Sequence, residues 1–237
     1  GAARGLGSAA VRLLAERGAS VVACDVRSAE GEQLAADLLA SGYPARFMTL
    51  DVTSEDDWRG VERAVTQEFA ALHVLVNNAG SNPAGDLGDT NDEIWRRAWD
   101  LKVFGYINLC RSMCHAMKQR RDGVIANIIG YAGERLFSRY IIGATGNAAL
   151  MAFSSSVGSQ SPDFGVRVFG INPGYTSTDR AESVLRKIAE TKFGSAERWR
   201  DVERDLDLPF GRMGTPKEVA DVVTFLVSPR ASYVSGT

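Results

Sequence analysis

The sequence predicts an α/β fold with a doubly wound parallel sheet, and three observations support this prediction. A glycine-rich stretch, Gly1–Gly7, runs directly into an amphipathic helix. Short apolar segments then alternate with helical ones along the chain, which is typical of parallel strands covered by helices. Asp25 closes the first apolar segment, twenty positions after Gly5. An acidic residue at that spacing bonds ribose hydroxyls in dinucleotide-binding folds.

The glycine-rich stretch has the character of a phosphate-binding loop. Glycines allow a tight turn and bring backbone N–H groups close to an anion at the start of the following helix. That helix carries an apolar face over 9–15 and ends at Gly18, as glycine-terminated helices do. A glycine turn that holds no ligand is the alternative interpretation.

The remaining elements follow from hydrophobic periodicity and turn residues. We expect strands over 20–24, 45–50, 74–76, 124–129 and 166–171. We expect helices over 29–41, from about 91 to 119, over 180–208 and over 218–226, with another opened by the capping residues Thr53 and Ser54. A single domain over 1–237 accounts for all of them.

Composition excludes several classes of protein. The chain has 237 residues, 45% of them hydrophobic, and a net charge of −2 with both signs interspersed. This balance argues against a nucleic-acid surface or a polybasic membrane anchor, and no apolar run is long enough to span a membrane. Three cysteines favour a reducing cytoplasm. Cys110, Cys114 and His115 could form a metal site, but small buried cysteines are the simpler interpretation, and we expect no metal.

Three motifs together resemble the short-chain dehydrogenase/reductase family. They are Gly1-x-x-x-Gly5-x-Gly7, the strand-end sequence 77–80 (Asn-Asn-Ala-Gly), and Pro173-Gly174 followed four residues later by Thr178. Residues 211–226 also match, so the resemblance covers essentially the whole chain. It implies a Rossmann-type three-layer sandwich that binds NAD(P), acts on a small molecule and assembles into homodimers or homotetramers.

The resemblance also implies which residues hold the cofactor. They are Gly1, Arg4, Gly5, Leu6, Gly7, Asp25, Asp51, Val52, Asn78, Ala79, Gly80, Ile128, Pro173, Gly174, Thr176 and Thr178. Asp51 would bond the adenine amino group, although a capping carboxylate is the alternative. Asp25 would repel a 2′-phosphate and so favours NAD over NADP, while Arg4 and Arg27 could offset its charge.

The family places a strand before the glycine-rich loop and another after 231–237. We therefore expect the printed sequence to be part of a slightly longer protein whose first, usually central, strand and whose last strand lie outside it.

Family catalysis uses a Ser, a Tyr-x-x-x-Lys pair and an Asn on the preceding helix. Aligned on the motifs above, these positions carry Gly130, Gly143, Asn147 and Lys102 in this chain. All four positions are changed, and neither glycine has a side chain that could transfer a proton or hold an oxyanion. The ordinary family mechanism cannot run with these residues.

Lysine and asparagine have, however, traded places. We hypothesise that Lys102 still puts an ammonium near the nicotinamide ribose and that a phenol arrives from another position. Tyr140, about one helical turn before Gly143, is the first candidate, followed by Tyr131 and Tyr175. The alternative is that Lys102 is a solvated helix lysine and that the tyrosines only pack.

The functional expectation is an NAD-dependent oxidoreductase that acts on an unknown carbonyl or alcohol with a non-standard active site. A catalytically silent NAD-binding sensor or scaffold is the main alternative, and different chemistry on a substrate that supplies its own proton is a third. Phe137, Tyr140, Tyr175 and a flap over 180–210 suggest a partly apolar substrate pocket.

Overall fold

The computed structural model describes residues 1–69 and 71–237. Its strands pair only in parallel and form two sheets, ordered β1-β2 and β3-β4-β5. They are β1 (Val21–Asp25), β2 (Ala45–Thr49), β3 (Val74–Asn77), β4 (Gly123–Ile128) and β5 (Val166–Ile171). Each expected strand is present within one residue of its predicted ends, which confirms the α/β class.

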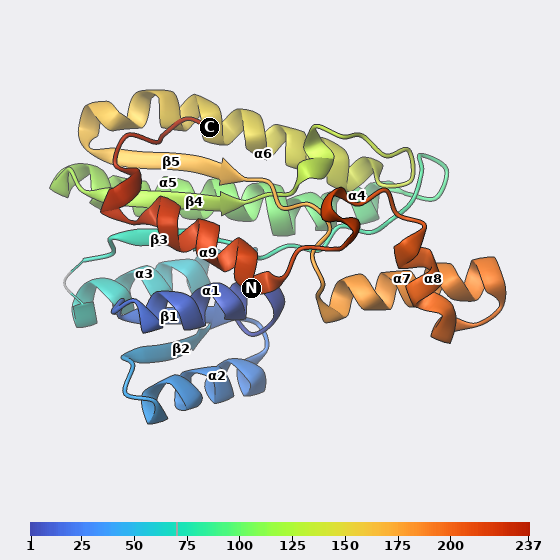
Figure 1. Cartoon of the computed structure of the whole chain (residues 1–237). Coiled ribbons are helices and arrows are strands. Elements are labelled where there is room, and N and C mark those ends of the chain that lie inside the picture. The colour runs from blue at the N-terminus through green and yellow to red at the C-terminus, as the bar shows by residue number, and fades with distance from the viewer. Residues whose placement is uncertain (70) are drawn as a thin grey trace.

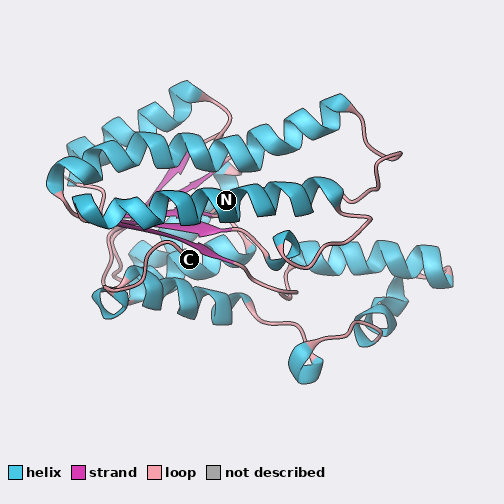
Figure 2. Ribbon diagram, turned by 90° about the horizontal axis from the view of Figure 1, so that it is seen from above, coloured by secondary structure: helices cyan, strands magenta, loops and turns pink. Residues whose placement is uncertain are grey.

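Helices cover both faces of the strands, as Figure 2 shows from above. They are α1 (Gly5–Glu16), α2 (Ser28–Ala40), α3 (Glu55–Phe69), α4 (Asp92–Trp99), α5 (Gly105–Arg120), α6 (Ile141–Gln160), α7 (Asp179–Phe193), α8 (Trp199–Arg204) and α9 (Pro216–Val227). No helix in the described part of the chain is both long and apolar enough to cross a membrane.

Alternating side chains of β4 show how the two faces are built. Ile125 is fully buried with residues of α5 and α6 on one face. Its neighbours Ala126 and Ile128 are buried with residues of α1 and α9 on the other. Because successive residues of a strand point to opposite faces, a strand buried on both sides is predominantly apolar, and the one polar side chain of β4, Asn127, is buried with hydrogen-bond partners.

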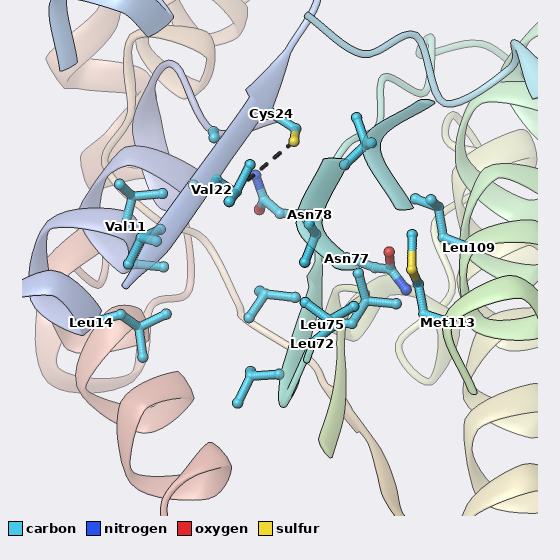
Figure 3. Close-up of a pocket in the computed structure, with 18 of the residues that line it drawn as sticks. Val11, Leu14, Val22, Cys24, Leu72, Leu75, Asn77, Asn78, Leu109 and Met113 are labelled. Carbon is cyan, nitrogen blue, oxygen red and sulfur yellow. Dashed lines mark hydrogen bonds between the residues drawn. The ribbon is translucent and has the colours of Figure 1, made fainter. Parts of the chain in front are cut away.

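The two sheets are separated by an apolar slot between β1 and β3 (Figure 3). Its volume is about 540 Å³, and it lies between side chains of α1 such as Val11 and side chains of α5 such as Leu109 and Met113. The sequence analysis expected a first, usually central strand that lies outside the printed sequence. No described segment of the chain fills the slot.

The prediction of one helix from about 91 to 119 is wrong in one respect. Between α4 and α5 the chain forms a π-helical turn, Asp100–Phe104, so the helix is interrupted at Lys102. Turns of this kind occur most often inside α-helices at functional sites.

The predicted flap is two helices, α7 and α8, which stand apart from the sheet beyond the end to which the β5 arrow points (Figure 1). Leu185, Ala189, Val202 and Met213 form a separate small core there. Along the second half of β5, residues 235–237 begin to pair with that strand through Gly236 N–H to Val168 O and Gly170 N–H to Thr237 O.

Candidate functional site

The glycine-rich loop folds back tightly on itself. A Cβ on Gly7 would lie 1.9 Å from the carbonyl oxygen of Gly1, and a Cβ on Gly1 would lie 2.8 Å from the backbone of Ala79. The Asn78 amide donates to Gly1 O at 2.7 Å and ties the loop to the end of β3. Only glycine fits at these two positions, so the loop brings its backbone to the carboxyl end of the sheet.

The helix that follows the loop presents an open N-terminus. Gly5 has φ +58°, Arg4 provides no side-chain cap, and the first turn of α1 carries no acidic residue. The first N–H groups of a helix and its dipole attract an anion. A pyrophosphate fits the charge and the donors of this cradle, so the residues present suit a dinucleotide.

Asp25 at the end of β1 is held by backbone groups. The N–H groups of Ala3 and Arg27 each donate to one of its carboxylate oxygens, both at 3.0 Å. Burial alone would raise the pKa of Asp25, but the Ala3 hydrogen bond, the positive amino group of Gly1 and the Arg27 hydrogen bond together outweigh it, and the pKa is lowered. The residue is therefore a fixed anion beside the glycine-rich loop. The Arg27 side chain pairs with Glu30 instead.

Asp51 is engaged within its own turn. Its Oδ1 accepts from Thr53 N–H at 2.9 Å and from the Thr53 hydroxyl at 2.7 Å. The side chains of Val52 and Ile128 are buried in the hydrophobic core, so these two residues present mainly their backbone to a bound cofactor. Leu6 is partly buried and packs against the same core.

Pro173, Gly174 and the two threonines follow β5. Thr178 caps α7 by accepting from Ala181 N–H at 3.2 Å, and its methyl group lies 3.5 Å from where a Gly5 Cβ would be. The Thr176 hydroxyl donates to Gly174 O at 3.1 Å. The fold thus brings Thr178 to the glycine-rich loop, although the two are far apart in sequence.

Lys102 lies inside the molecule, contrary to the alternative that it is a solvated lysine. Only 9% of it is exposed, and its Nζ donates to Ile129 O at 2.5 Å. Its stem lies 2.9 Å from where a Gly80 Cβ would be. Burial lowers the pKa of Lys102 to about 8, and the nearby positive charge of Arg180 contributes.

The two glycines at the expected Ser and Tyr positions leave spaces that other side chains fill. Gly130 has φ +121°, and the Asn147 Nδ2 lies 3.1 Å from where its Cβ would be and donates to Gly130 O at 3.2 Å. A Cβ on Gly143 would lie 2.2 Å from the ring of Tyr140 and 2.7 Å from its hydroxyl oxygen. Asn147 Oδ1 is buried and has no partner among the described residues.

The three candidate tyrosines differ in their surroundings. The Tyr140 hydroxyl accepts from Asn82 Nδ2 at 3.4 Å. Tyr131 instead packs with Phe137 and Tyr175, with ring centroids 5.7 and 5.8 Å apart. Burial raises the pKa of Tyr131, as does its hydrogen bond with Tyr175. Tyr140 is the phenol that lies at a vacated position.

Arg180 was missed by the sequence analysis. In the first turn of α7 it donates to Gly80 O at 3.1 Å and to Asn82 O at 3.0 Å, and so joins the flap to the loop after β3. The sequence could have indicated it, because a basic residue in the first turn of a helix is disfavoured by the helix dipole, so that its presence suggests a further role.

Cys110 is not available as part of the conceivable metal site. Its thiol accepts from the Asn77 amide at 3.3 Å, inside a buried network that continues to Asn127 and Ser154. This network ties β3 and β4 to α5 and α6.

Comparison with known proteins gives one consistent family. The family model described as enoyl-(acyl carrier protein) reductase matches residues 1–237. A 3-oxoacyl-(acyl-carrier-protein) reductase of Vibrio cholerae is 31% identical over 242 residues, which cover 100% of this chain and 91% of that protein. A cis-4-hydroxycyclohexanecarboxylate dehydrogenase of Sinomonas cyclohexanicum is 33% identical, with 100% and 90% covered.

Solved structures agree. An actinorhodin polyketide ketoreductase with NADPH superposes with a TM-score of 0.93 at 27% identity, covering 100% of this chain and 91% of that one. An L-sorbose reductase from Gluconobacter frateurii, complexed with NADPH and L-sorbose, has a TM-score of 0.92 at 26% identity, with 100% and 90% covered.

Proposed function

The chain belongs to the short-chain dehydrogenase/reductase family of oxidoreductases, and from this premise we propose that it moves hydride between NAD and a carbonyl or alcohol, with Tyr140 as the proton-transfer group. The position of the Tyr140 ring carries the proposal. It occupies the space next to Gly143, with its hydroxyl oxygen 2.7 Å from where a Gly143 Cβ would be, so a phenol from three residues earlier lies at the base of the place where the resemblance puts the family's tyrosine.

The chemistry divides among the residues around Gly143. A nicotinamide cofactor, when bound, would supply or accept the hydride. In the direction of reduction, Tyr140 Oη gives its proton to the substrate oxygen, and Asn82 Nδ2 holds that hydroxyl in place. Lys102 keeps a positive charge at the end of β4, which favours negative charge as it develops on the substrate oxygen. The Asn147 Nδ2 donates to the backbone carbonyl of Gly130 and so fixes the turn there.

Asp25 supports NAD over NADP within this proposal. Its carboxylate is held as an anion at the end of β1, where it would meet the adenosine ribose. Titration of the protein with NADH and with NADPH, followed by nicotinamide fluorescence, should give the tighter dissociation constant for NADH. Two of the similar solved structures contain NADPH, so NADPH is the competing cofactor. Tighter binding of NADPH than of NADH would overturn the proposal of NAD.

The catalytic part is tested in the same cuvette with a panel of ketones, aldehydes and quinones. Oxidation of NADH by a panel member, lost in Tyr140→Phe and kept in the matched control Tyr131→Phe, supports the proposal. Unchanged turnover in Tyr140→Phe would remove Tyr140 from the mechanism.

A silent NAD-binding sensor or scaffold is the second candidate. The conformation of Gly130 favours it, because φ +121° strains any other residue there and makes the usual serine hard to accommodate. Tight NADH binding with no turnover across the whole panel is the result that would favour this function over the first.

The remaining expectations are also proposals. We place the protein in the cytoplasm as one domain, consistent with three free cysteines, and expect a homodimer or homotetramer. Light scattering during size exclusion tests the assembly, and a monomer would contradict it.

A further inference from the structure

We propose that the substrate carries a carboxylate and that this group binds between Lys102 and Arg180. The inference rests on the proposed oxidoreductase function and adds to it the chemical class of the substrate. Three observations carry it: two cations lie close together, neither has an acidic partner among the residues that the structure describes, and both adjoin the proposed proton donor.

The two cations approach the same residue from different elements. The Lys102 stem, from the π-helical turn, lies against Gly80, and the Arg180 guanidinium, from α7, binds the Gly80 carbonyl. Like charges so close repel each other, and nothing in the hydrogen bonds of the fold requires both to be basic. A neutral side chain could fill either place.

Neither cation has a counterion within 1–69 and 71–237. In this part of the chain, Lys102 and Arg180 bond only to backbone carbonyls of Ile129, Gly80 and Asn82. Among the ion pairs of the described residues, none includes either side chain.

The acidic residues nearby in the sequence or the flap do not compensate. Asp100 and Asp179 are exposed, while Asp89 and Asp207 pair with Arg139 and Arg135. Arg180 is exposed, so water solvates its charge, but Lys102 is buried. A buried charge is normally paired, because the loss of water around it is otherwise uncompensated. The site therefore has the electrostatics of one that waits for an anion.

The position of the cations favours the substrate as the source of that anion. Arg180 binds the backbone of Asn82, and the side chain of Asn82 binds the hydroxyl of Tyr140. The charges thus adjoin the proton donor, at the end of β4. A carboxylate can accept a bidentate bond from arginine together with a bond from an ammonium. A cofactor phosphate is the competing source, because Thr178 brings the start of α7 to the glycine-rich loop.

The test measures binding rather than turnover. The full protein, saturated with NAD⁺ so that no ketone can be reduced, is titrated by calorimetry with 2-oxo, 3-oxo and 4-oxo acids and with the primary amide of each. At least one acid should bind about tenfold more tightly than its amide or better, as expected for charge-assisted hydrogen bonds. Equal binding of every pair, or no binding of any acid, overturns the proposal.

Variants assign the preference to the two cations. Lys102→Met should abolish the preference for the acid, and Arg180→Met, at an exposed position that tolerates substitution, should reduce it. Lys217→Met, which removes an exposed lysine from α9, is the matched control and should keep the full preference. If Lys102→Met does not fold, Arg180→Met alone decides, and an unchanged preference in it overturns the site.

The outcomes separate this inference from the proposed function. Loss of NAD⁺ affinity in Lys102→Met and Arg180→Met, without any preference for acids in the wild type, would assign the cations to the cofactor phosphates. Normal NAD⁺ binding with no preference for acids over amides would refute the carboxylate site and leave the proposed oxidoreductase function standing. An acid preference in a protein that does not bind NAD⁺ would keep the anion site and refute hydride transfer.

Discussion

Two regions of this molecule are built around glycines, and they use them in opposite ways. In the glycine-rich loop, the space a Gly7 side chain would need is filled by the backbone of Gly1. At the candidate catalytic site, the space beside Gly143 is filled by the ring of Tyr140, and the space beside Gly130 by the amide of Asn147. The first region uses glycine to bring backbone close to a ligand, and the second uses it to admit side chains from elsewhere. A missing side chain therefore does not imply an empty site.

The strongest test of this difference is the hydroxyl of Tyr140. If the ring beside Gly143 supplies the proton, Tyr140→Phe should lower turnover by about 10²- to 10⁴-fold, as expected for loss of a general acid. NADH affinity should stay unchanged, because the ring and the glycine-rich loop are kept. Single-turnover kinetics and fluorescence titration measure the two effects separately. A parallel loss of NADH affinity would show that the two regions are not independent.

The charge of Lys102 gives the next largest effect. Burial lowers the pKa of Lys102 to about 8, below the usual 10.5. Between these two pH values the unfolded chain therefore binds the proton more tightly than the folded one. Lys102 is thus destabilising below pH 8, and its cost disappears as pH rises to 10.5. Lys102→Met should raise the free energy of unfolding at pH 7 by up to about 3 kcal/mol.

Denaturant titrations of the wild type and Lys102→Met at pH 7, 9 and 10.5 measure that difference. The gain in the variant should shrink at the two higher values. A variant that is less stable at pH 7, by an amount independent of pH, would show that the lysine is not desolvated as the structure indicates.

Gly7→Ala tests the first region. Its new methyl group would meet the Gly1 carbonyl oxygen at 1.9 Å, and backbone cannot move aside as a side chain can. We expect a loss of about 1 to 3 kcal/mol in the free energy of unfolding together with weaker NADH binding. Gly143→Ala is the comparison, because it meets the Tyr140 ring and should cost turnover more than NADH affinity. Equal effects of both variants on NADH binding would show that the glycine-rich loop and the candidate catalytic site do not use their glycines in different ways.

The smallest expected effect is a control that belongs to neither region. Gly60 lies within α3, and the nearest atom to its Cβ position is 4.0 Å away. Gly60→Ala should therefore raise the free energy of unfolding by about 0.5 to 1 kcal/mol, as expected inside a helix. Thermal unfolding checks it, and a loss of stability would mean that glycine substitutions in this fold cannot be interpreted from contact distances.

The sequence predicted the fold well because each element carries its own periodicity. β4 and β5 were found from apolar runs, and α9 from the match of 211–226 to the family pattern. The candidate site was predicted only in part. The substituted positions follow from motif spacing, but the burial of Lys102 depends on the π-helical turn, which no local residue announces. The role of Arg180 depends on contacts across about a hundred positions of sequence.

The π-helical turn also has a consequence for how this site can change. It holds one residue more than an α-helical turn. The number of residues between Asn91 and Lys102 therefore determines the direction in which the Lys102 side chain points. Substitutions at Gly130 or Gly143 alter one side chain, whereas deletion of a single residue from Asp100–Phe104 would restore a regular helix and turn everything beyond it by about 100° relative to α4. A single-residue insertion or deletion in this helix should therefore disturb the site more than an exchange of residue type at one of its positions.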